Sequence, residues 1–404
     1  LAVVVFGFVS FYFINARHFG IDFTWQQSLI HTLRSFLLVE DSSIEPITRF
    51  GKEYIWIIRS LGFFTWFFLL YSLIRTDKNK LKQNEGHREK AKFILRQYGK
   101  SPVDYFKVYK DKLIFISSVF DAFISYKISG NFAIVLEEPV GPEEDKLNVL
   151  REFESHCYRM GLRPAFYRVD ESSLHLFETL KKNKLKIGQE AILDAKNFTL
   201  EGRDKKSLRN GLNSLQKSGF VTTIHPAPQT DSFVRKLKKV SDEWLLEFDK
   251  TESVFSQGMF DMDEIKNQDV ITVEDQNQNV KAFLNIIPDF AEDECTYDLI
   301  RKTNDAPGAA MDALIVKMVE YAVNKRKDFI NMGMVPMAGL PKTNHTPEQI
   351  IKVASEKLKR FQHYKGLRFF KEKYATIWEN KYLVYDNDFD LIQLPVALGN
   401  VMKP

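Results

Sequence analysis

The residues that could do chemistry lie in a linked set of segments in the second half of the chain. In order, the segments are SDEWL (241–245), VFSQGMFD (254–261), TYDLIR (296–301), FINMGMVPMAGL (329–340) and YKGLRFFKEKYATIWENKYLVY (364–385). They are rich in acids, bases and aromatic residues. The sequence has no GxxxxGK[ST], HExxH or GxSxG motif, and no GxGxxG follows a strand-like segment. These absences argue against a nucleotide hydrolase, a zinc protease and a serine hydrolase.

Composition narrows the class further. The 404 residues are 44% hydrophobic and 27% charged, which excludes a disordered chain and a small disulfide scaffold. The eight His residues lack metal-ligand spacing, so no metal site is expected. Cys157 and Cys295 are the two cysteines, which argues against a disulfide framework and favours a reducing compartment. The net charge of +4 suggests an anionic partner.

Basic residues gather in two clusters. Residues 201–240 hold nine Lys and Arg against three acids, and residues 351–373 hold eight against two. Four aromatic residues interleave with the second cluster: Phe361, Tyr364, Phe369 and Phe370. Basic residues alternating with aromatics suit a phosphate backbone with exposed bases, as in single-stranded RNA. The alternative interpretation is a solvated helix whose aromatic residues face the core.

Two apolar segments near the start of the sequence predict membrane helices. Residues 54–74 form a 21-residue apolar stretch with one charge, Arg59, which is long enough to span a bilayer. The alternative is a buried core helix. Residues 1–14 are apolar but too short to span, so we expect the end of a truncated spanning helix. A signal peptide is the alternative, although no charged region and no small-residue cleavage site precede Arg17.

Flanking charges predict the orientation of the membrane region. Eight Lys and Arg residues follow between positions 75 and 96, whereas the connection 15–53 carries four. The positive-inside rule therefore places everything after residue 74 in the cytoplasm. We expect a multi-pass protein of the plasma (inner) membrane with cytoplasmic catalytic domains. The basic run also suits anionic lipid headgroups, and its alternative interpretation is a solvated juxtamembrane helix.

From residue 88 to 385, strand-like and helix-like segments alternate. The pattern predicts an α+β class with two similar units in tandem and a boundary near residue 200. Residues 1–84 are expected to form the membrane region and basic linker, 85–200 the first domain and 201–390 the second. Helices are predicted at 146–160, 172–183, 205–217, 231–246 and after 307–308. Strands are predicted at 112–118, 122–128, 132–136, 164–169, 189–193, 221–225, 270–274, 282–287, 295–299 and 329–332.

Taken in order, the five segments resemble the C-terminal domain of the phosphatidylglycerol lysyltransferase family, also called multiple peptide resistance factors. The resemblance covers residues 90–385. Upstream it includes ILRQYGKSPVDYF (94–106), EEPVG (137–141), GLRPAFYRVD (161–170), KIGQEAIL (186–193) and RNGLN (209–213). Any one of these motifs is weak, but the five segments in register across residues 241–385 are specific.

The resemblance implies tandem GNAT-like acyltransferase folds, preceded by transmembrane helices, on the cytoplasmic side of the membrane. It also implies an aminoacyltransferase that moves an aminoacyl group, usually lysyl, from aminoacyl-tRNA to the glycerol hydroxyl of phosphatidylglycerol. The cationic product lipid gives resistance to cationic antimicrobial peptides. The implied partners are aminoacyl-tRNA, anionic phospholipid and the membrane, with no cofactor. Gln257, Met259 and Ile300 depart from the family pattern, so the amino acid and the acceptor lipid stay open.

Within the resemblance, Asp298 and Arg301 of TYDLIR are the first candidates for catalysis. Asp298 would act as the base for the lipid hydroxyl or orient the substrate ammonium, and burial would raise its pKa into a useful range. Arg301 would clamp a phosphate or carbonyl. Residues three apart in a regular strand face opposite sides, so the two share a site only if the strand ends or bulges between them. Lys371, with Arg368 and Lys373, would contact the tRNA end or transition-state charge.

The aminoacyl pocket is expected between these segments. Glu252 or Asp261 would pair with the incoming ammonium. Three aromatic side chains would wall the pocket: Trp244, Phe255 and Phe260. For each of these five residues the alternative is a place in the core or a helix cap.

Residues outside the pocket complete the expectations. Arg209 and Asn210 are candidates for lipid headgroup contact, and Glu190 at the junction of the two units is expected to be structural. The segment RKTNDAPGAA (301–310), where an acetyltransferase would hold a pyrophosphate, has the single glycine Gly308 and lacks Gly-x-Gly. This argues against coenzyme A and for another acyl donor. A membrane-tethered acyl-CoA transferase and a non-catalytic module that binds tRNA or lipid remain the two alternatives.

Overall fold

The computed structural model divides into two compact units, residues 1–80 and 81–404. It describes residues 2–39, 45–74, 85–247, 251–339 and 360–404. The predictions that fall on residues 75–84, most of the basic linker, and on 340–359 lie outside the described residues.

In its described residues, unit one contains three helices, α1 (Ala2–Phe19), α2 (Trp25–Phe36) and α3 (Arg49–Ile74). A small aromatic cluster holds them together, with Phe11, Phe19 and Tyr54 buried in it. The Tyr54 hydroxyl donates to the Gly7 carbonyl at 2.9 Å, which ties α3 to α1. The sequence analysis did not predict α2. It begins at a capping box in which Thr24 and Gln27 bond each other's backbone.

Within the described residues of unit one, the stretch Arg49–Ser72 of α3 is long and apolar enough to cross a membrane. This agrees with the segment predicted at 54–74. The apolar part of α1, Val3–Tyr12, is shorter than a span requires. A spanning role for α1 and a multi-pass topology therefore stay predictions.

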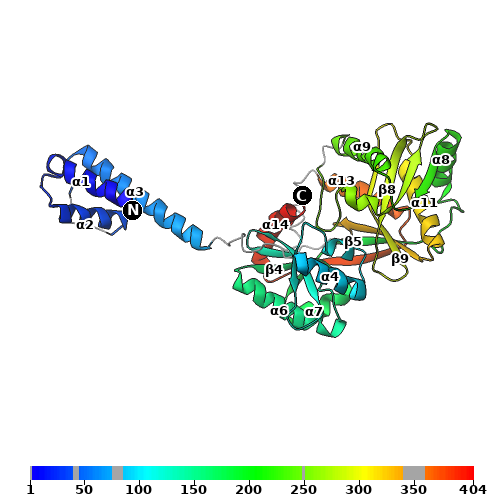
Figure 1. Ribbon diagram of the computed structural model, residues 1–404, viewed down its shortest axis with the longest axis horizontal. Helices are drawn as coiled ribbons and strands as arrows, with labels where there is room; N and C mark the ends of the chain where they lie inside the picture. The colour runs from blue at the N-terminus through cyan, green and yellow to red at the C-terminus, as the bar shows by residue number, and fades with distance from the viewer. Residues whose placement is uncertain (1, 40–44, 75–84, 248–250, 340–359) are drawn as a thin grey trace. The chain divides into compact units, whose positions relative to one another are not determined.

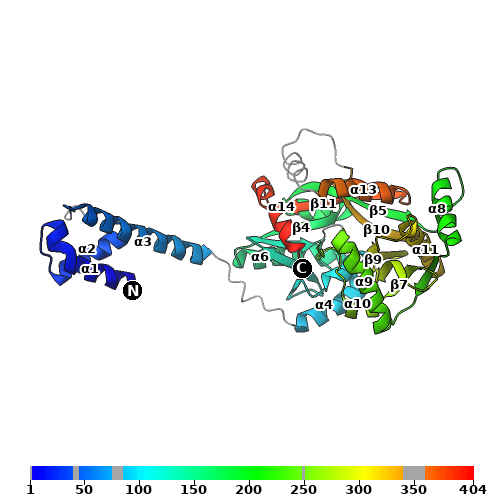
Figure 2. The same cartoon turned by 90° about the horizontal axis from the view of Figure 1, so that it is seen from above.

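Unit two is built on one mixed sheet of eleven strands in the order β1-β2-β3-β4-β11-β5-β10-β9-β8-β7-β6 (Figures 1 and 2). The strands are β1 (Leu113–Ile116), β2 (Phe123–Ser129), β3 (Phe132–Leu136), β4 (Arg163–Asp170), β5 (Asn183–Asp194), β6 (Val221–His225), β7 (Asp269–Glu274), β8 (Val280–Ile287), β9 (Glu294–Lys302), β10 (Phe329–Pro336) and β11 (Ile377–Tyr385).

The helices in the described residues of unit two are α4 (Glu85–Tyr98), α5 (Asp104–Lys107), α6 (Lys146–Arg159), α7 (Leu174–Thr179), α8 (Lys206–Lys217), α9 (Asp231–Glu247), α10 (Met262–Lys266), α11 (Ala310–Asn324), α13 (Arg360–Glu372) and α14 (Leu394–Val401). Short 3₁₀ turns are η2 (Glu143–Asp145), η3 (Glu171–Ser173) and η4 (Asp388–Ile392).

Helices cover both faces of the sheet because its central strands are apolar on both sides. We call the strands β1-β2-β3-β4-β11-β5 the first half of the sheet and β10-β9-β8-β7-β6 the second half. In the second half, α9 lies on one face while α8 and α11 lie on the other, with β8 between them in Figure 1. In the first half, α6 and α7 cover one face, while α5 and α14 cover the other. These separate apolar clusters fix which side chains of each strand face which helix layer.

The last strand joins the two halves. β11 lies antiparallel between β4 and β5, and β5 in turn pairs with β10, the first strand of the second half in the sheet order. Residues 377–385, which the sequence analysis assigned to the second domain, therefore complete the sheet beside strands of the first. The boundary near residue 200 stays a prediction, and it falls in the connection between β5 and α8.

The expected strands and helices between residues 112 and 332 are present, with ends shifted by a few residues. Three differences matter. The predicted helix 172–183 is the shorter α7, and β5 starts at Asn183 instead of Gln189. β11 was not predicted, because its polar residues Glu379, Asn380 and Lys381 conceal the alternation of a half-buried strand.

Candidate functional site

Asp298 lies at a bulge in β9. The register pairs Leu284 with Ile300 and Ile286 with Tyr297, so one residue of β8, Asn285, faces two residues of β9. Asn285 accepts a hydrogen bond from the Leu299 N–H at 2.8 Å and so replaces the ladder bond that the bulge removes. The bulge is the irregularity that the sequence analysis required between Asp298 and Arg301.

A buried chain of hydrogen bonds supports the bulge from behind. The Asn285 amide donates to Gln268 at 2.8 Å, and the Gln268 amide donates to the Tyr105 hydroxyl at 3.1 Å. Asn285 is 2% exposed and Gln268 6% exposed, so both depend on these partners. Through Tyr105 of α5, the first half of the sheet thus helps to hold the strand that carries Asp298.

The Asp298 carboxylate is half-buried under the loop 251–261. The Gly258 N–H donates to Asp298 Oδ1 at 2.9 Å. A β-carbon placed on Gly258 would lie 2.3 Å from Asp298 Oδ2 and 3.2 Å from the Phe106 ring. Glycine is therefore the residue that lets this loop approach the carboxylate.

Burial raises the pKa of Asp298 to about 7, against the Gly258 hydrogen bond and the Arg301 charge, which lower it. The charge of Asp298 also contributes to the raised pKa of its neighbour Tyr109. Burial has the largest effect on Tyr109, and the negative charges of Glu264 and Asp261 act in the same direction. Asp298 thus has the proton affinity of a group that can take up and release a proton near neutral pH.

Arg301 is 6% exposed, and both terminal nitrogens of its guanidinium have partners. It donates to Glu252 through both terminal nitrogens, at 2.9 and 2.6 Å, and to the Ser241 hydroxyl of α9 at 2.5 Å. Glu252 also accepts from the Phe260 N–H at 3.2 Å. In this arrangement Arg301 and Glu252 fasten the loop 251–261 to β9 and α9, whereas the sequence analysis expected both to face substrate.

The other residues expected in the pocket take structural positions. Asp261 caps α10 by accepting from the Asp263 and Glu264 N–H groups, and it forms an ion pair with Lys110. Phe260 packs edge-to-face with Phe283 in the cluster beneath α9. These are the core and cap alternatives stated above.

Two further aromatic residues were expected to wall the pocket. Phe255 is fully buried at φ +87°, packed among strands of the first half. Trp244 lies half-buried on α9.

Lys371 of α13 is 5% exposed and points at the irregular part of β10. Its ammonium donates to the Gly333 carbonyl at 2.9 Å and the Met334 carbonyl at 3.4 Å. Gly333 has φ +81°, a conformation that suits glycine and turns its carbonyl toward the lysine. Burial lowers the pKa of Lys371 to about 7, although Glu190 opposes the shift. Lys371 is thus a second group poised near neutral pH.

Glu190 sits in a buried ion network on the central strands. It forms ion pairs with Arg168 of β4 and with Lys381 of β11, the latter at 2.6 Å. Glu190, Arg168 and Lys381 are each at most 3% exposed. The two cations hold the pKa of Glu190 well below its usual value, at about 2, against the effect of burial. The structural role expected for Glu190 fits this network across three strands.

The remaining basic candidates lie at the surface of the second half. Arg368 pairs with Glu372 one turn on at 2.6 Å and lies over the Trp378 ring. Lys373 forms an ion pair with Asp312 of α11.

The two candidates for headgroup contact lie on α8. Arg209 donates to the Gly202 carbonyl at 2.8 Å and to the Leu200 carbonyl, and Asn210 is exposed. The structure does not gather Arg209, Arg368, Lys373 and Asp298 around one contact network in the described residues.

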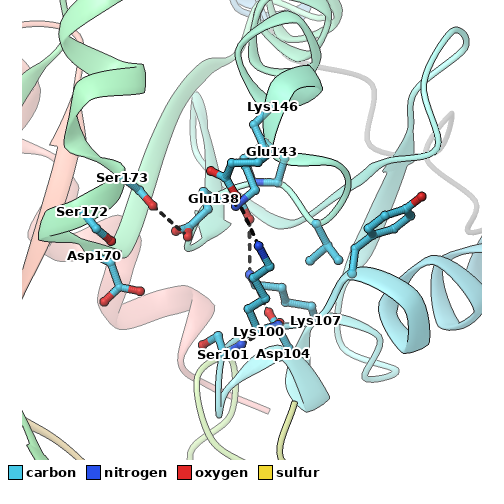
Figure 3. A pocket seen from close by; sticks show the side chains of 13 residues that line it. Lys100, Ser101, Asp104, Lys107, Glu138, Glu143, Lys146, Asp170, Ser172 and Ser173 are labelled. Atoms are coloured by element: carbon cyan, nitrogen blue, oxygen red, sulfur yellow. Dashed lines mark hydrogen bonds and ion pairs between the residues drawn. The ribbon is translucent and has the colours of Figure 1, made fainter. Parts of the chain in front are cut away.

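A separate polar hollow of about 370 Å³ lies at the carboxyl ends of the parallel strands β3 and β4 (Figure 3). Four of its charged side chains form ion pairs within the hollow: Lys107 pairs with Asp104 at 2.7 Å, and Lys146 pairs with Glu143 at 2.9 Å. Ser173 donates to Glu138 at 3.0 Å across the hollow. In the described part of the chain, no group of three or more His, Cys, Asp or Glu residues could hold a metal ion.

The family model "Phosphatidylglycerol lysyltransferase, C-terminal" matches residues 92–385. The chain belongs to this family. The match contains all the site residues described above, and it confirms the family suggested by the sequence motifs. The match ends with β11, so η4 and α14 lie beyond it.

Known proteins of the phosphatidylglycerol lysyltransferase family agree with this assignment. The Bacillus subtilis phosphatidylglycerol lysyltransferase is 30% identical over 321 residues, which cover 79% of this chain and 37% of the relative. The solved structure of L-PGS from Bacillus licheniformis has a TM-score of 0.70 and 29% identity, and it covers 77% of this chain and 96% of that one.

A C-terminal domain of a lysylphosphatidylglycerol synthetase from Agrobacterium fabrum gives the same TM-score and identity, covering 80% of this chain and 98% of that one. The chain spans about two fifths of the length of its curated relatives, 37% and 42% for two of them. The solved structures thus correspond to nearly the whole of unit two, and the α+β class with a mixed sheet is confirmed.

Several residues of the site had no signal that sequence reasoning used. Gly258 was part of a quoted motif, but its close approach to Asp298 appears only in three dimensions. Gln268 lies in a turn, where a polar residue is unremarkable. Asn285 interrupts an apolar run at 282–287 of β8 and could have been flagged, because a buried amide needs fixed partners.

Proposed function

We propose that this chain transfers an aminoacyl group, most simply lysyl, from aminoacyl-tRNA to the glycerol hydroxyl of phosphatidylglycerol. The observation that carries the proposal is the half-buried Asp298 at the β9 bulge, with a pKa of about 7, in a chain of this family. The reaction is an ester exchange, which needs a base for a hydroxyl but no oxidant or reductant.

In the proposed step, the lipid hydroxyl gives its proton to Asp298 while its oxygen attacks the aminoacyl carbonyl. The tetrahedral intermediate then collapses, the bond to the tRNA ribose oxygen breaks, and the proton on Asp298 passes to that oxygen. A carboxylate with a pKa near the working pH is suited to both halves of this exchange. Lys371, with its lowered pKa, is proposed to stabilise negative charge or relay a proton.

The contacts around Asp298 suggest how the base is oriented. Gly258 binds Oδ1 and leaves Oδ2 as the proton acceptor. Arg301 and Glu252 hold the loop in place and supply the charges that act on Asp298. Arg301 remains a candidate for direct substrate contact if Glu252 releases it when substrate enters the site.

The partners are also proposals. The basic residues of 201–240 and 351–373 are proposed to attract tRNA, and α3 is proposed to anchor the chain in the plasma membrane, close to its lipid substrate. The tandem GNAT-like relationship of the two halves, the cytoplasmic site and the peptide resistance that cationic lipid would confer belong to the same proposal.

The test is an assay with radiolabelled lysyl-tRNA and phosphatidylglycerol vesicles, repeated with other charged tRNAs. Label that enters lipid supports the proposal. Turnover with acyl-CoA alone would support a membrane-tethered acyltransferase instead, and binding without turnover would support a non-catalytic module. Asp298→Asn should lower turnover at least ~10²-fold with folding intact, as expected for a positioned base. Unchanged turnover would remove Asp298 from the mechanism.

A further inference from the structure

The end of the chain packs in the same apolar cluster as the loop 251–261, which covers Asp298. Residues 386–404 form η4 and α14, drawn in red in Figures 1 and 2. The apolar side of this segment is buried in the same cluster as Phe255 of the loop, and it consists of Leu391, Leu394, Ala397 and Val401. The segment is thus part of the core that seats the loop.

Hydrogen bonds join the tail to the loop directly. The Met402 carbonyl accepts from the Val254 N–H at 3.0 Å and from the Ser253 hydroxyl at 3.2 Å. The next residue of the tail is held as well, because the Lys127 ammonium of β2 donates to the Lys403 carbonyl at 3.1 Å. The tail therefore links the loop to a strand of the first half.

The anchored part of the loop lies close in sequence to the residues that reach the site. Glu252, next to Ser253, binds Arg301 through both carboxylate oxygens. Gly258, four residues after Val254, donates to Asp298. Four residues of chain span at most about 14 Å, so Gly258 and the residues anchored by the tail lie close together along the loop. Phe255, which is fully buried, lies between them and packs in the core.

We propose that the C-terminal segment 386–404 is a positioning element of the site, in which the Met402 carbonyl and the apolar side of α14 fix the loop 251–261 over Asp298. The segment lies beyond the residues that the family model matches, so the family assignment does not supply this role. The proposal rests on the proposed function for its effect on turnover, but its structural part can be tested without turnover.

The test compares a one-residue truncation with a three-residue truncation. Removal of Pro404 alone keeps the peptide carbonyl of Met402 and leaves a Lys403 oxygen for Lys127, whereas removal of 402–404 deletes both. The shorter truncation should leave turnover within twofold of the full chain. The longer one should lower kcat about tenfold or more at an unchanged KM for tRNA, since misplacing a catalytic group by ~1 Å costs up to ~10²-fold.

Two further measurements separate positioning from general loss of fold. In the 402–404 deletion, the pH of half-maximal kcat should move below that of the full chain, because a displaced loop lets water reach Asp298 and its pKa falls toward the ordinary value. Hydrogen exchange should show faster exchange of the Val254 and Gly258 amides, with the amides of β8 and α11 unchanged. Full-chain values of kcat, pH midpoint and amide protection in this deletion would overturn the proposal.

If the longer truncation fails to fold, hydrogen exchange of the full chain still tests the proposal. The Val254 amide should then exchange in the same opening event as the last amides of α14, with the same dependence on mild denaturant. Independent exchange would overturn the proposal. If the full chain has no turnover, the proposed function fails, and the exchange measurement alone decides the positioning role.

Discussion

Replacing Gly258 by alanine tests how closely the loop must approach Asp298. The new β-carbon would lie 2.3 Å from Asp298 Oδ2, whereas ordinary van der Waals contact begins near 3.4 Å. The new β-carbon would also lie 3.2 Å from the Phe106 ring, which limits its movement away from the carboxylate. Either the loop or the carboxylate must therefore move by about 1 Å, and the hydrogen bond from the Gly258 N–H to Asp298 is stretched or lost.

The expected loss follows from that displacement. A shift of about 1 Å in a reacting group costs up to ~10²-fold in rate, so Gly258→Ala should lower kcat by roughly 10²-fold. Stability should change less than turnover, because the substitution disturbs only the contact between the loop and Asp298 and alanine reduces the freedom of the unfolded chain. The effect should therefore appear in turnover and leave the midpoint of thermal unfolding within a few degrees.

The assay measures transfer of labelled lysine from tRNA to phosphatidylglycerol, together with thermal unfolding. Gly308→Ala is the matched control: it is the same change in the same half of the sheet, and its β-carbon would meet no atom within 4 Å. The control should keep wild-type turnover. If Gly258→Ala keeps it as well, Asp298 tolerates displacement, and the close approach of the loop has no part in the reaction.

Three other predictions follow from the charges. Arg168→Leu leaves Glu190 buried with one cation fewer and should lower the unfolding free energy by about 3–5 kcal/mol. Asp242→Asn breaks an exposed ion pair on α9 and should lower it by less than ~0.5 kcal/mol. Chemical denaturation measures both losses, and equal losses would refute the burial argument. The pKa of Asp298 is raised in the folded protein, so its ionisation destabilises the fold as the pH rises from about 4 to 7. Asp298→Asn removes this ionisation and should raise the unfolding temperature at pH 8. The increase should become smaller as the pH falls toward 4. Filter binding should show tRNA affinity that falls steeply with salt, and a flat dependence would reject the basic clusters as the tRNA surface.

The sequence alone determined the family, the α+β class and most of the strands. Apolar alternation and turn residues are local signals, and they placed β2, β3 and β7 to within a residue or two. Motifs in a fixed order identified the family because their joint spacing is improbable by chance. The same motifs pointed to Asp298 and Lys371, and burial moves the pKa of each to about 7, while their catalytic roles stay predictions.

Tertiary structure decided the roles of the neighbours. Arg301 and Glu252 were both predicted to face substrate, yet they bind each other, because a buried guanidinium needs a carboxylate partner and Glu252 is within reach. No local pattern could show that pairing across 49 residues. Asp261, by contrast, caps α10 for a local reason, and a helix cap was the alternative that the sequence analysis gave for it.

Long-range pairing also decided the shape of the sheet. β11 inserts between β4 and β5 because its backbone groups complete both ladders, although 185 to 218 residues separate the paired positions in sequence. The bulge at Asp298 is supported by Asn285 on another strand, which supplies the missing acceptor. The sequence thus determined which residues are chemically able to act. Packing between distant segments decided which of these residues come into contact. Contacts between strands depend on register and burial, which neighbouring residues do not encode.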